Sequence, residues 1–142
     1  MLAAEQNANR GGRIFSFKLF QSDHLLATKA LLEFDGIEVN TQDEEGRSAL
    51  ILAAKRGVAQ VVQSLLEFSG TEVDARDRKG RTALMFAAEA GRVGVVQLLL
   101  ACSTIEFDAM DNDGKSALDL ALDQGHQKVV QILEGRGQSR AT

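Results

Sequence analysis

The fold of this chain can be read from residues 77–91, which run DRKGRTALMFAAEAG. Asp77 and Gly80 have the chemistry of a tight turn, because a carboxylate can accept backbone N–H groups and glycine tolerates positive φ. Thr82 follows as the predicted N-cap of a helix. Gly91 is placed to end that helix in the left-handed conformation. Between the cap and this glycine, apolar residues recur at helical spacing, at Leu84, Ala87 and Ala88.

The same pattern occurs three times along the chain, with a period of 34 residues. Residues 43–57 and 111–125 repeat it, and Ser48 and Ser116 stand at the N-cap position of Thr82. After each terminal glycine, apolar pairs four positions apart predict a second helix, first at Val61-Val62 with Leu65-Leu66. Chance similarity would not repeat one spacing three times. The chain is therefore predicted to stack turn–helix–turn–helix units.

This pattern resembles the ankyrin repeat, Asp-x-x-Gly-x-Thr-x-Leu-x-x-Ala-Ala-x-x-Gly, and the resemblance covers about residues 14–134. It implies an all-α ankyrin-repeat solenoid of helix–turn–helix units joined by hairpin-like turns. Two full repeats are expected between N- and C-terminal capping repeats. In chain order the expected parts are a flexible tail (1–13), a degenerate N-terminal repeat (14–42), two full repeats (43–76 and 77–110), a capping repeat (111–134) and a second flexible tail (135–142).

Both expected ends differ from the central repeats. Leu31 and Leu32 align with Leu65 and Leu66, which is the clearest remnant of the repeat in the N-terminal copy. In the last copy, polar residues replace residues that are apolar or small in at least one earlier copy, as the end of a solenoid requires. These polar residues are Asp119, Asp123, Gln127, Lys128 and Glu134.

The sequence departs from the family in three ways. Its period is one residue longer, and alanine replaces the family's proline after each cap. The family's histidine two positions further on is replaced by Ile51, Met85 and Asp119. Because that histidine supports hydrogen bonds around the hairpin in the family, the resemblance implies less tightly tethered turns here.

Charge and composition narrow the classes of partner and compartment. The net charge of −4 and the sequence pI of about 5.2 disfavour nucleic acid and anionic membranes as main partners. The chain has no Trp or Tyr to serve as interface anchors, and no apolar run long enough to span a membrane. A single cysteine favours a reducing compartment, so we expect a cytoplasmic or nuclear protein. An organellar transit peptide stays an alternative, because Arg10, Arg13 and Lys18 outnumber Glu5.

Few residues could carry chemistry. His24 and His126 are the only histidines and Cys102 is the only cysteine, and none of them has metal-ligand spacing. Cys102 is predicted to be a small buried hydrophobe. The stretch from Asp111 to Gly114 begins a repeat turn, because a calcium loop needs Gly at its sixth position and Glu at its twelfth. We therefore expect no catalytic residue, cofactor, metal or small-molecule substrate.

One local pattern concerns modification. Leu32, Glu38, Val39 and Asn40 match the pattern that asparagine hydroxylases accept in ankyrin repeats, which makes hydroxylation of Asn40 one interpretation. The alternative is that the Asn40 side chain satisfies hydrogen bonds of the turn.

Ankyrin-like proteins bind partners with their turn tips and the exposed part of the short helices. The resemblance thus implies a monomeric, non-catalytic adaptor, scaffold or inhibitor that binds another protein. By position, the predicted contact residues are Arg47, Lys55, Arg56, Arg76, Arg78, Lys79, Arg81, Glu89, Met110, Asn112, Asp113 and Lys115.

Four of these residues, within 76–81, make the middle tip basic, whereas the neighbouring tips carry carboxylates. This contrast predicts a partner with an acidic patch, because arginine can grip carboxylates with two hydrogen bonds. The alternative is a solvated tip that binds nothing. Two other functions stay open: part of a larger enzyme or regulatory protein, and a nucleic-acid-associated regulator.

Overall fold

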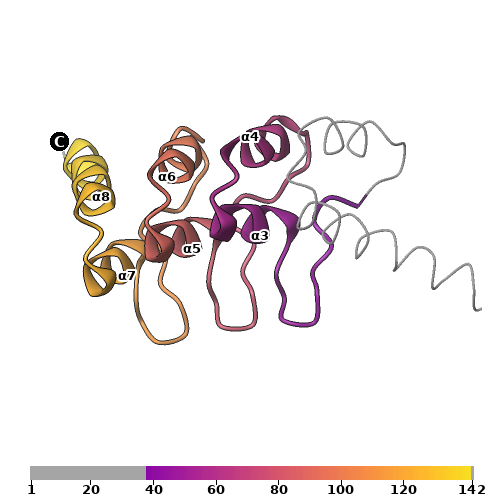
Figure 1. Ribbon diagram of the computed structural model, residues 1–142, viewed down its shortest axis with the longest axis horizontal. Helices are drawn as coiled ribbons and strands as arrows, with labels where there is room; N and C mark the ends of the chain where they lie inside the picture. The colour runs from indigo at the N-terminus through magenta and orange to yellow at the C-terminus, as the bar shows by residue number, and fades with distance from the viewer. Residues whose placement is uncertain (1–37, 142) are drawn as a thin grey trace, which may run out of the picture.

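The computed structural model describes residues 38–141 of the chain (Figure 1). This range contains six α-helices and no β-strand, only an isolated antiparallel bridge between Met110 and Ser116. The helices are α3 (Ala49–Arg56), α4 (Ala59–Glu67), α5 (Ala83–Ala90), α6 (Val93–Leu100), α7 (Ala117–Gln124) and α8 (Gln127–Ala141). The predicted all-α repeat solenoid is confirmed. The expected tail 1–13 and most of the expected repeat 14–42, with Leu31 and Leu32, lie outside the described residues.

The helices form two rows (Figure 1). The short helices α3, α5 and α7 make an inner row, and α4, α6 and α8 make an outer row. The hairpins that precede α3, α5 and α7 extend from the inner row, away from the outer row. Helix α5 packs between α3 and α7, and α6 packs between α4 and α8. Each unit therefore contacts its neighbours in sequence, as a solenoid requires.

The inner helices begin and end where the sequence predicted. The hydroxyl groups of Ser48, Thr82 and Ser116 accept the backbone N–H groups of Ile51, Met85 and Asp119 at 3.2–3.3 Å. Asp119 also accepts the N–H of Ser116, which completes a capping box. The helices end at left-handed glycines with φ of 72–77°, namely Gly57, Gly91 and Gly125. An L side chain is strained at such φ values, so the three glycines are conformationally required.

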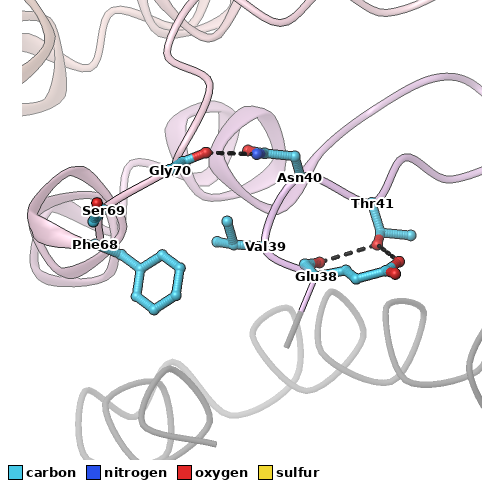
Figure 2. A pocket seen from close by; sticks show the side chains of 7 residues that line it. All are labelled: Glu38, Val39, Asn40, Thr41, Phe68, Ser69 and Gly70. Carbon is cyan, nitrogen blue, oxygen red and sulfur yellow. Dashed lines mark hydrogen bonds between the residues drawn. The ribbon is translucent and has the colours of Figure 1, made fainter. Parts of the chain in front are cut away.

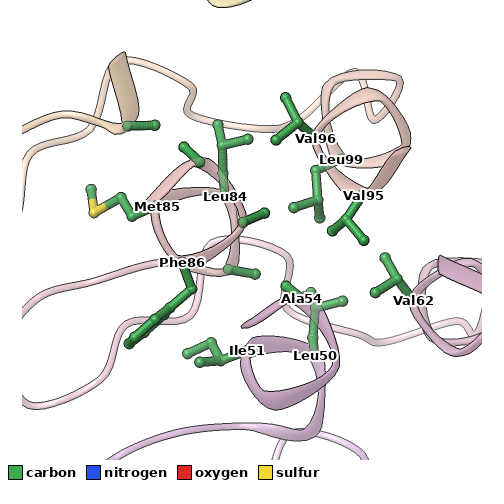
Figure 3. Packing of buried hydrophobic residues seen from close by; sticks show 14 of the residues in the cluster. Leu50, Ile51, Ala54, Val62, Leu84, Met85, Phe86, Val95, Val96 and Leu99 are labelled. Atoms are coloured by element: carbon green, nitrogen blue, oxygen red, sulfur yellow. The ribbon is translucent and has the colours of Figure 1, made fainter. Parts of the chain in front are cut away.

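A continuous apolar core lies between the two rows. Its central members in Figure 3 are Leu84 from α5 and Val95, Val96 and Leu99 from α6, all of them buried, while Met85 is buried on the side of α5 away from α6. Ile51 and Val62 extend the core into the first unit, and Val129 and Leu133 extend it into the last. Burying one such side chain contributes about 1.5–3 kcal/mol by transfer from water. Burial of these side chains thus holds the inner and outer rows of helices together.

The C-terminal end of the solenoid is polar, as predicted. Asp119, Asp123, Gln127, Lys128 and Glu134 are all exposed. Leu122 is also 52% exposed, because α7 has no further inner helix in the described chain to cover it. Helix α8 continues past Glu134, where the sequence analysis placed the end of the repeat, and reaches Ala141. The chain has no proline that would stop it.

None of the described helices is both long enough and apolar enough to cross a membrane.

Candidate binding surface of hairpins and inner helices

Each hairpin is closed by the aspartate that begins the repeat. Asp43, Asp77 and Asp111 each donate a backbone N–H to the carbonyl four residues later, at 2.9–3.0 Å. Their carboxylates in turn accept two backbone N–H groups, two and four residues later, at 2.8–3.0 Å. Gly46, Gly80 and Gly114 complete the turns at φ of 75–80°. The predicted turn chemistry of Asp and Gly is confirmed.

Backbone hydrogen bonds join each hairpin to the next. The N–H of Arg78 donates to the carbonyl of Glu45 at 3.1 Å, and the N–H of Asn112 donates to that of Lys79 at 3.0 Å. Gly46 lies at the first of these contacts, where a Cβ would come within 2.9 Å of the Arg78 nitrogen. The strand-like arms of the hairpins are thus held side by side without the family's histidine.

Side chains at one repeat position reinforce these links. Gln42 donates its amide to the carbonyl of Arg76 at 2.9 Å, and Arg76 donates its guanidinium to the carbonyl of Met110 at 2.9 Å. Met110 holds the same position in the last described hairpin, and it is 57% exposed. The looser turns expected from the missing histidine are therefore offset by other tethering groups.

The inner helices are also linked across repeats at their C-terminal ends. The Arg92 guanidinium donates to the carbonyl of Lys55 at 3.3 Å. His126, one repeat later, places Nε2 2.9 Å from the carbonyl oxygen of Glu89. Because a carbonyl oxygen only accepts, Nε2 carries the proton in this bond. His126 therefore satisfies the end of a neighbouring helix, which supports its structural interpretation.

Arg81 is the most connected of the predicted site residues. Its guanidinium lies 2.8 Å from Glu89, 3.4 Å from Asp111 and 5.9 Å from the centroid of the Phe86 ring. The Arg81 side chain is 20% exposed and that of Asp111 is 1% exposed. Burial raises the pKa of Asp111. The backbone hydrogen bonds from Lys115 and Asp113, together with the Arg81 charge, outweigh burial and leave its pKa below the ordinary value.

The predicted basic patch is thus divided by the structure. Arg76 is exposed but bonded to the Met110 carbonyl and lies 3.8 Å from Glu106, while Arg81 is an internal ion-pair partner. Arg78 and Lys79, at the tip, are exposed, and within the described part of the chain neither side chain has an ion pair. The side chains available to a partner at this tip are therefore those of Arg78 and Lys79.

The remaining predicted residues of the first unit lie beside this tip. Arg47 pairs with Asp43 at 3.0 Å and with Glu45 at 3.1 Å. Lys55 is exposed at the end of α3, with its ammonium 5.7 Å from the Phe86 centroid. Arg56, next to it, is half-buried.

The third hairpin is mostly occupied by its own contacts. Asn112 donates its amide to the carbonyl of Arg78 at 3.1 Å, and Lys115 pairs with Asp123. Asp113 is exposed. Among the predicted residues of this hairpin, Met110 and Asp113 are the ones whose side chains face solvent without such a bond.

The family model for ankyrin repeats, described as three copies, matches residues 19–111 and, in a second match, residues 69–139. This chain belongs to the ankyrin-repeat family. Ankyrin repeats are general protein–protein interaction modules, and the family is typically non-catalytic. No curated protein matches the chain.

In this ankyrin-repeat protein, Asn40 links the segment before α3 to the loop that follows α4. Its amide donates to the carbonyl of Gly70 at 2.6 Å, and its oxygen accepts the N–H of Glu72 at 2.8 Å. A pocket of about 460 Å³ lies beside it, lined by Glu38, Val39, Asn40, Thr41, Phe68, Ser69 and Gly70 (Figure 2). The alternative in which Asn40 satisfies backbone groups thus has direct geometric support. Its hydroxylation stays a prediction.

Cys102 fits the ankyrin outer layer as a packing residue. It is half-buried and packs against the apolar core. Burial, assisted by the charge of Asp74, raises the pKa of the Cys102 thiol. The thiol is therefore protonated at neutral pH, which disfavours a nucleophilic role. In the described residues no group of three or more His, Cys, Asp and Glu side chains is placed to hold a metal ion.

Phe86 is the residue of this surface that the sequence analysis missed. It is 9% exposed, and the centroid of its ring lies 5.7 Å from the Lys55 ammonium and 5.9 Å from the Arg81 guanidinium. The repeat alignment contains one signal for it, because Leu52 and Leu120 occupy the equivalent positions and only the middle repeat has an aromatic ring there.

Proposed function

We propose that this ankyrin-repeat protein is a non-catalytic adaptor or inhibitor that binds an acidic surface of another protein through its hairpin tips and inner helices. The observation that supports this proposal most strongly is the middle tip. Arg78 and Lys79 are exposed there and have no side-chain ion pair in the described range, whereas Arg47, Arg81 and Lys115 are all paired with carboxylates of the chain itself.

Two positive side chains at the centre of an extended surface suit electrostatic recognition. Complementary charge steers an acidic partner and disfavours a basic one. The tip can present these side chains reproducibly, because its backbone is bonded to both neighbouring hairpins through Arg78 and Lys79 themselves. Such preorganisation lowers the entropic cost of binding. We further propose that the protein acts as a monomer in the cytoplasm or nucleus.

The test is a quantitative pull-down with the intact chain, the double variant Arg78→Glu/Lys79→Glu and a matched control, Lys128→Glu/Arg136→Glu. Lys128 and Arg136 are exposed on α8 and have no side-chain ion pair in the described part of the chain, so the control changes the net charge equally at a distant place. Proteins bound by the parent and the control, but lost with the tip variant, would support the proposal. A partner that the folded tip variant retains at parental affinity would contradict it.

A nucleic-acid partner is the other use of a basic tip. The net charge of −4 disfavours it. If nucleic acid were the partner, the logarithm of the binding constant would fall steeply and linearly with the logarithm of salt concentration. The same pull-down, repeated after nuclease treatment, separates the two cases.

A further inference from the structure

One ion pair recurs between the base of a hairpin and the end of the inner helix that follows it. In the middle repeat it joins Arg81 to Glu89 at 2.8 Å, and in the last repeat it joins Lys115 to Asp123. These pairs occupy equivalent positions, since each residue of the second pair is 34 positions after its counterpart. The repeat geometry therefore places a cation and a carboxylate within contact distance here.

The first described unit breaks this rule. Its equivalent positions are Arg47 and Lys55, so both members are cations. Arg47 forms ion pairs with two carboxylates of its own hairpin, those of Asp43 and Glu45. Lys55 has no carboxylate partner in the described chain, and its ammonium lies over the Phe86 ring of the next repeat.

Helix electrostatics explain only part of this arrangement. A cation in the last turn of α3 interacts favourably with the helix dipole, which stabilises Lys55 in any case. Helix α5 forms with Glu89 at the equivalent position and with no basic residue in its last turn. The dipole therefore does not require a lysine here. Nor does it explain why the position opposite Lys55 is also a cation.

We propose that Lys55, at the position where the later repeats carry a carboxylate, binds a carboxylate of an acidic segment of the partner protein. This inference rests on the proposed function and identifies one of its anchor points. The partner's carboxylate would pair with Lys55 beside the hairpin base, where Glu89 and Asp123 supply a carboxylate in the other repeats. The Arg81 guanidinium lies 5.9 Å from the centroid of the same Phe86 ring, but it is already paired with Glu89 and Asp111, so the free cations nearest along the surface are Arg78 and Lys79. An acidic segment crossing from the first inner helix to the middle tip would meet Lys55 at one end and Arg78 and Lys79 at the other.

The probe for this site is a hexaglutamate peptide blocked at both ends, titrated into the full-length ¹⁵N-labelled chain and followed by amide chemical shifts. We expect the largest shift changes at the amides of Arg47, Lys55 and Phe86. In Lys55→Glu, which supplies the missing carboxylate from within the chain, the apparent Kd should rise on the order of tenfold. Lys128→Glu makes the same change in net charge on the outer row and should leave the Kd within about twofold of the parent.

Other results would overturn the assignment. Equal weakening by Lys55→Glu and Lys128→Glu would mean that only the net charge matters. If Lys55→Glu raised the Kd for a six-residue single-stranded DNA as much as it raised the Kd for the peptide, the position would bind any polyanion and not a carboxylate in particular. If Arg78→Glu/Lys79→Glu weakens the peptide while Lys55→Glu does not, this inference is wrong and the proposed function stands. If neither tip nor Lys55 variants weaken it, both are wrong. A thermal melt of each variant confirms that it is folded.

Discussion

The imidazole of His126 closes the C-terminal end of a helix that ends at Ala90, with Nε2 2.9 Å from the carbonyl oxygen of Glu89. Its ring lies against Gly91, where an added Cβ would come within 2.7 Å of Nδ1. The glycine that ends the helix therefore also makes room for the residue that satisfies it. The last repeat and the middle repeat are joined through this contact as well as through the core.

Replacing Gly91 by alanine should destabilise the protein. The residue would have to adopt φ of about +72° and would displace the His126 ring. The left-handed backbone alone costs about 1–2 kcal/mol. Gly94 is the matched control, because it lies in α6 with nothing within 4 Å of an added Cβ. Gly94→Ala should stabilise the helix by up to about 1 kcal/mol. Urea unfolding of both variants measures the difference, and equal stabilities would contradict this account.

Removing Arg81 should cost about 2 kcal/mol, because Asp111 would remain buried without its opposing charge. Arg78, three positions earlier in the same hairpin, is exposed, so Arg78→Ala should change the free energy of unfolding by less than about 0.5 kcal/mol. Denaturant titrations of Arg81→Ala and Arg78→Ala provide the comparison. If the two variants unfolded at the same midpoint, Arg81 would be a tip residue and not an internal partner.

The stability contributed by Asp111 should depend on pH in one direction. Its pKa is below the unfolded value, so the folded chain favours the ionised carboxylate. This stabilisation is complete above the unfolded pKa of about 3.9 and is lost as the pH falls through the lowered pKa of the folded state. Asp111→Asn should therefore be less stable than the parent by about 1–2 kcal/mol at neutral pH, with the gap closing in acid. The exposed neighbour Asp113 serves as the control, and a gap that stays constant down to low pH would argue against this linkage.

A carboxylate introduced by Lys55→Glu should couple to Arg47, as Glu89 does to Arg81. The interaction is measured by a double-mutant cycle of Lys55→Glu and Arg47→Gln, which cancels the lost helix-dipole and Phe86 contacts. We expect a favourable coupling of about 0.2–1 kcal/mol that weakens in high salt. A coupling of zero at low salt would mean that the first unit does not share the geometry of the later ones.

The amino-acid sequence was sufficient for the turns, N-caps and terminal glycines of the inner helices, which depend on local chemistry. The cap hydroxyls of Ser48, Thr82 and Ser116, the turn carboxylates and the left-handed glycines all act within a few residues of their own positions. Because this local pattern recurs every 34 residues, the sequence also predicted that the units stack. The polar outer face of the last repeat was equally readable, because a solenoid end must face water.

Only the tertiary structure decided which of the predicted cations are available to a partner. The contacts of Arg81 with Glu89 and Asp111 span 8 and 30 residues, and the Lys55–Phe86 contact spans two repeats. Such pairs depend on the orientation of a hairpin relative to its helix and on the stacking of one repeat on the next. The order of charges along the chain does not contain either piece of information. The sequence therefore determined that the middle tip is basic, whereas the packing of neighbouring repeats decided that Arg81 is held internally while Arg78 and Lys79 face solvent.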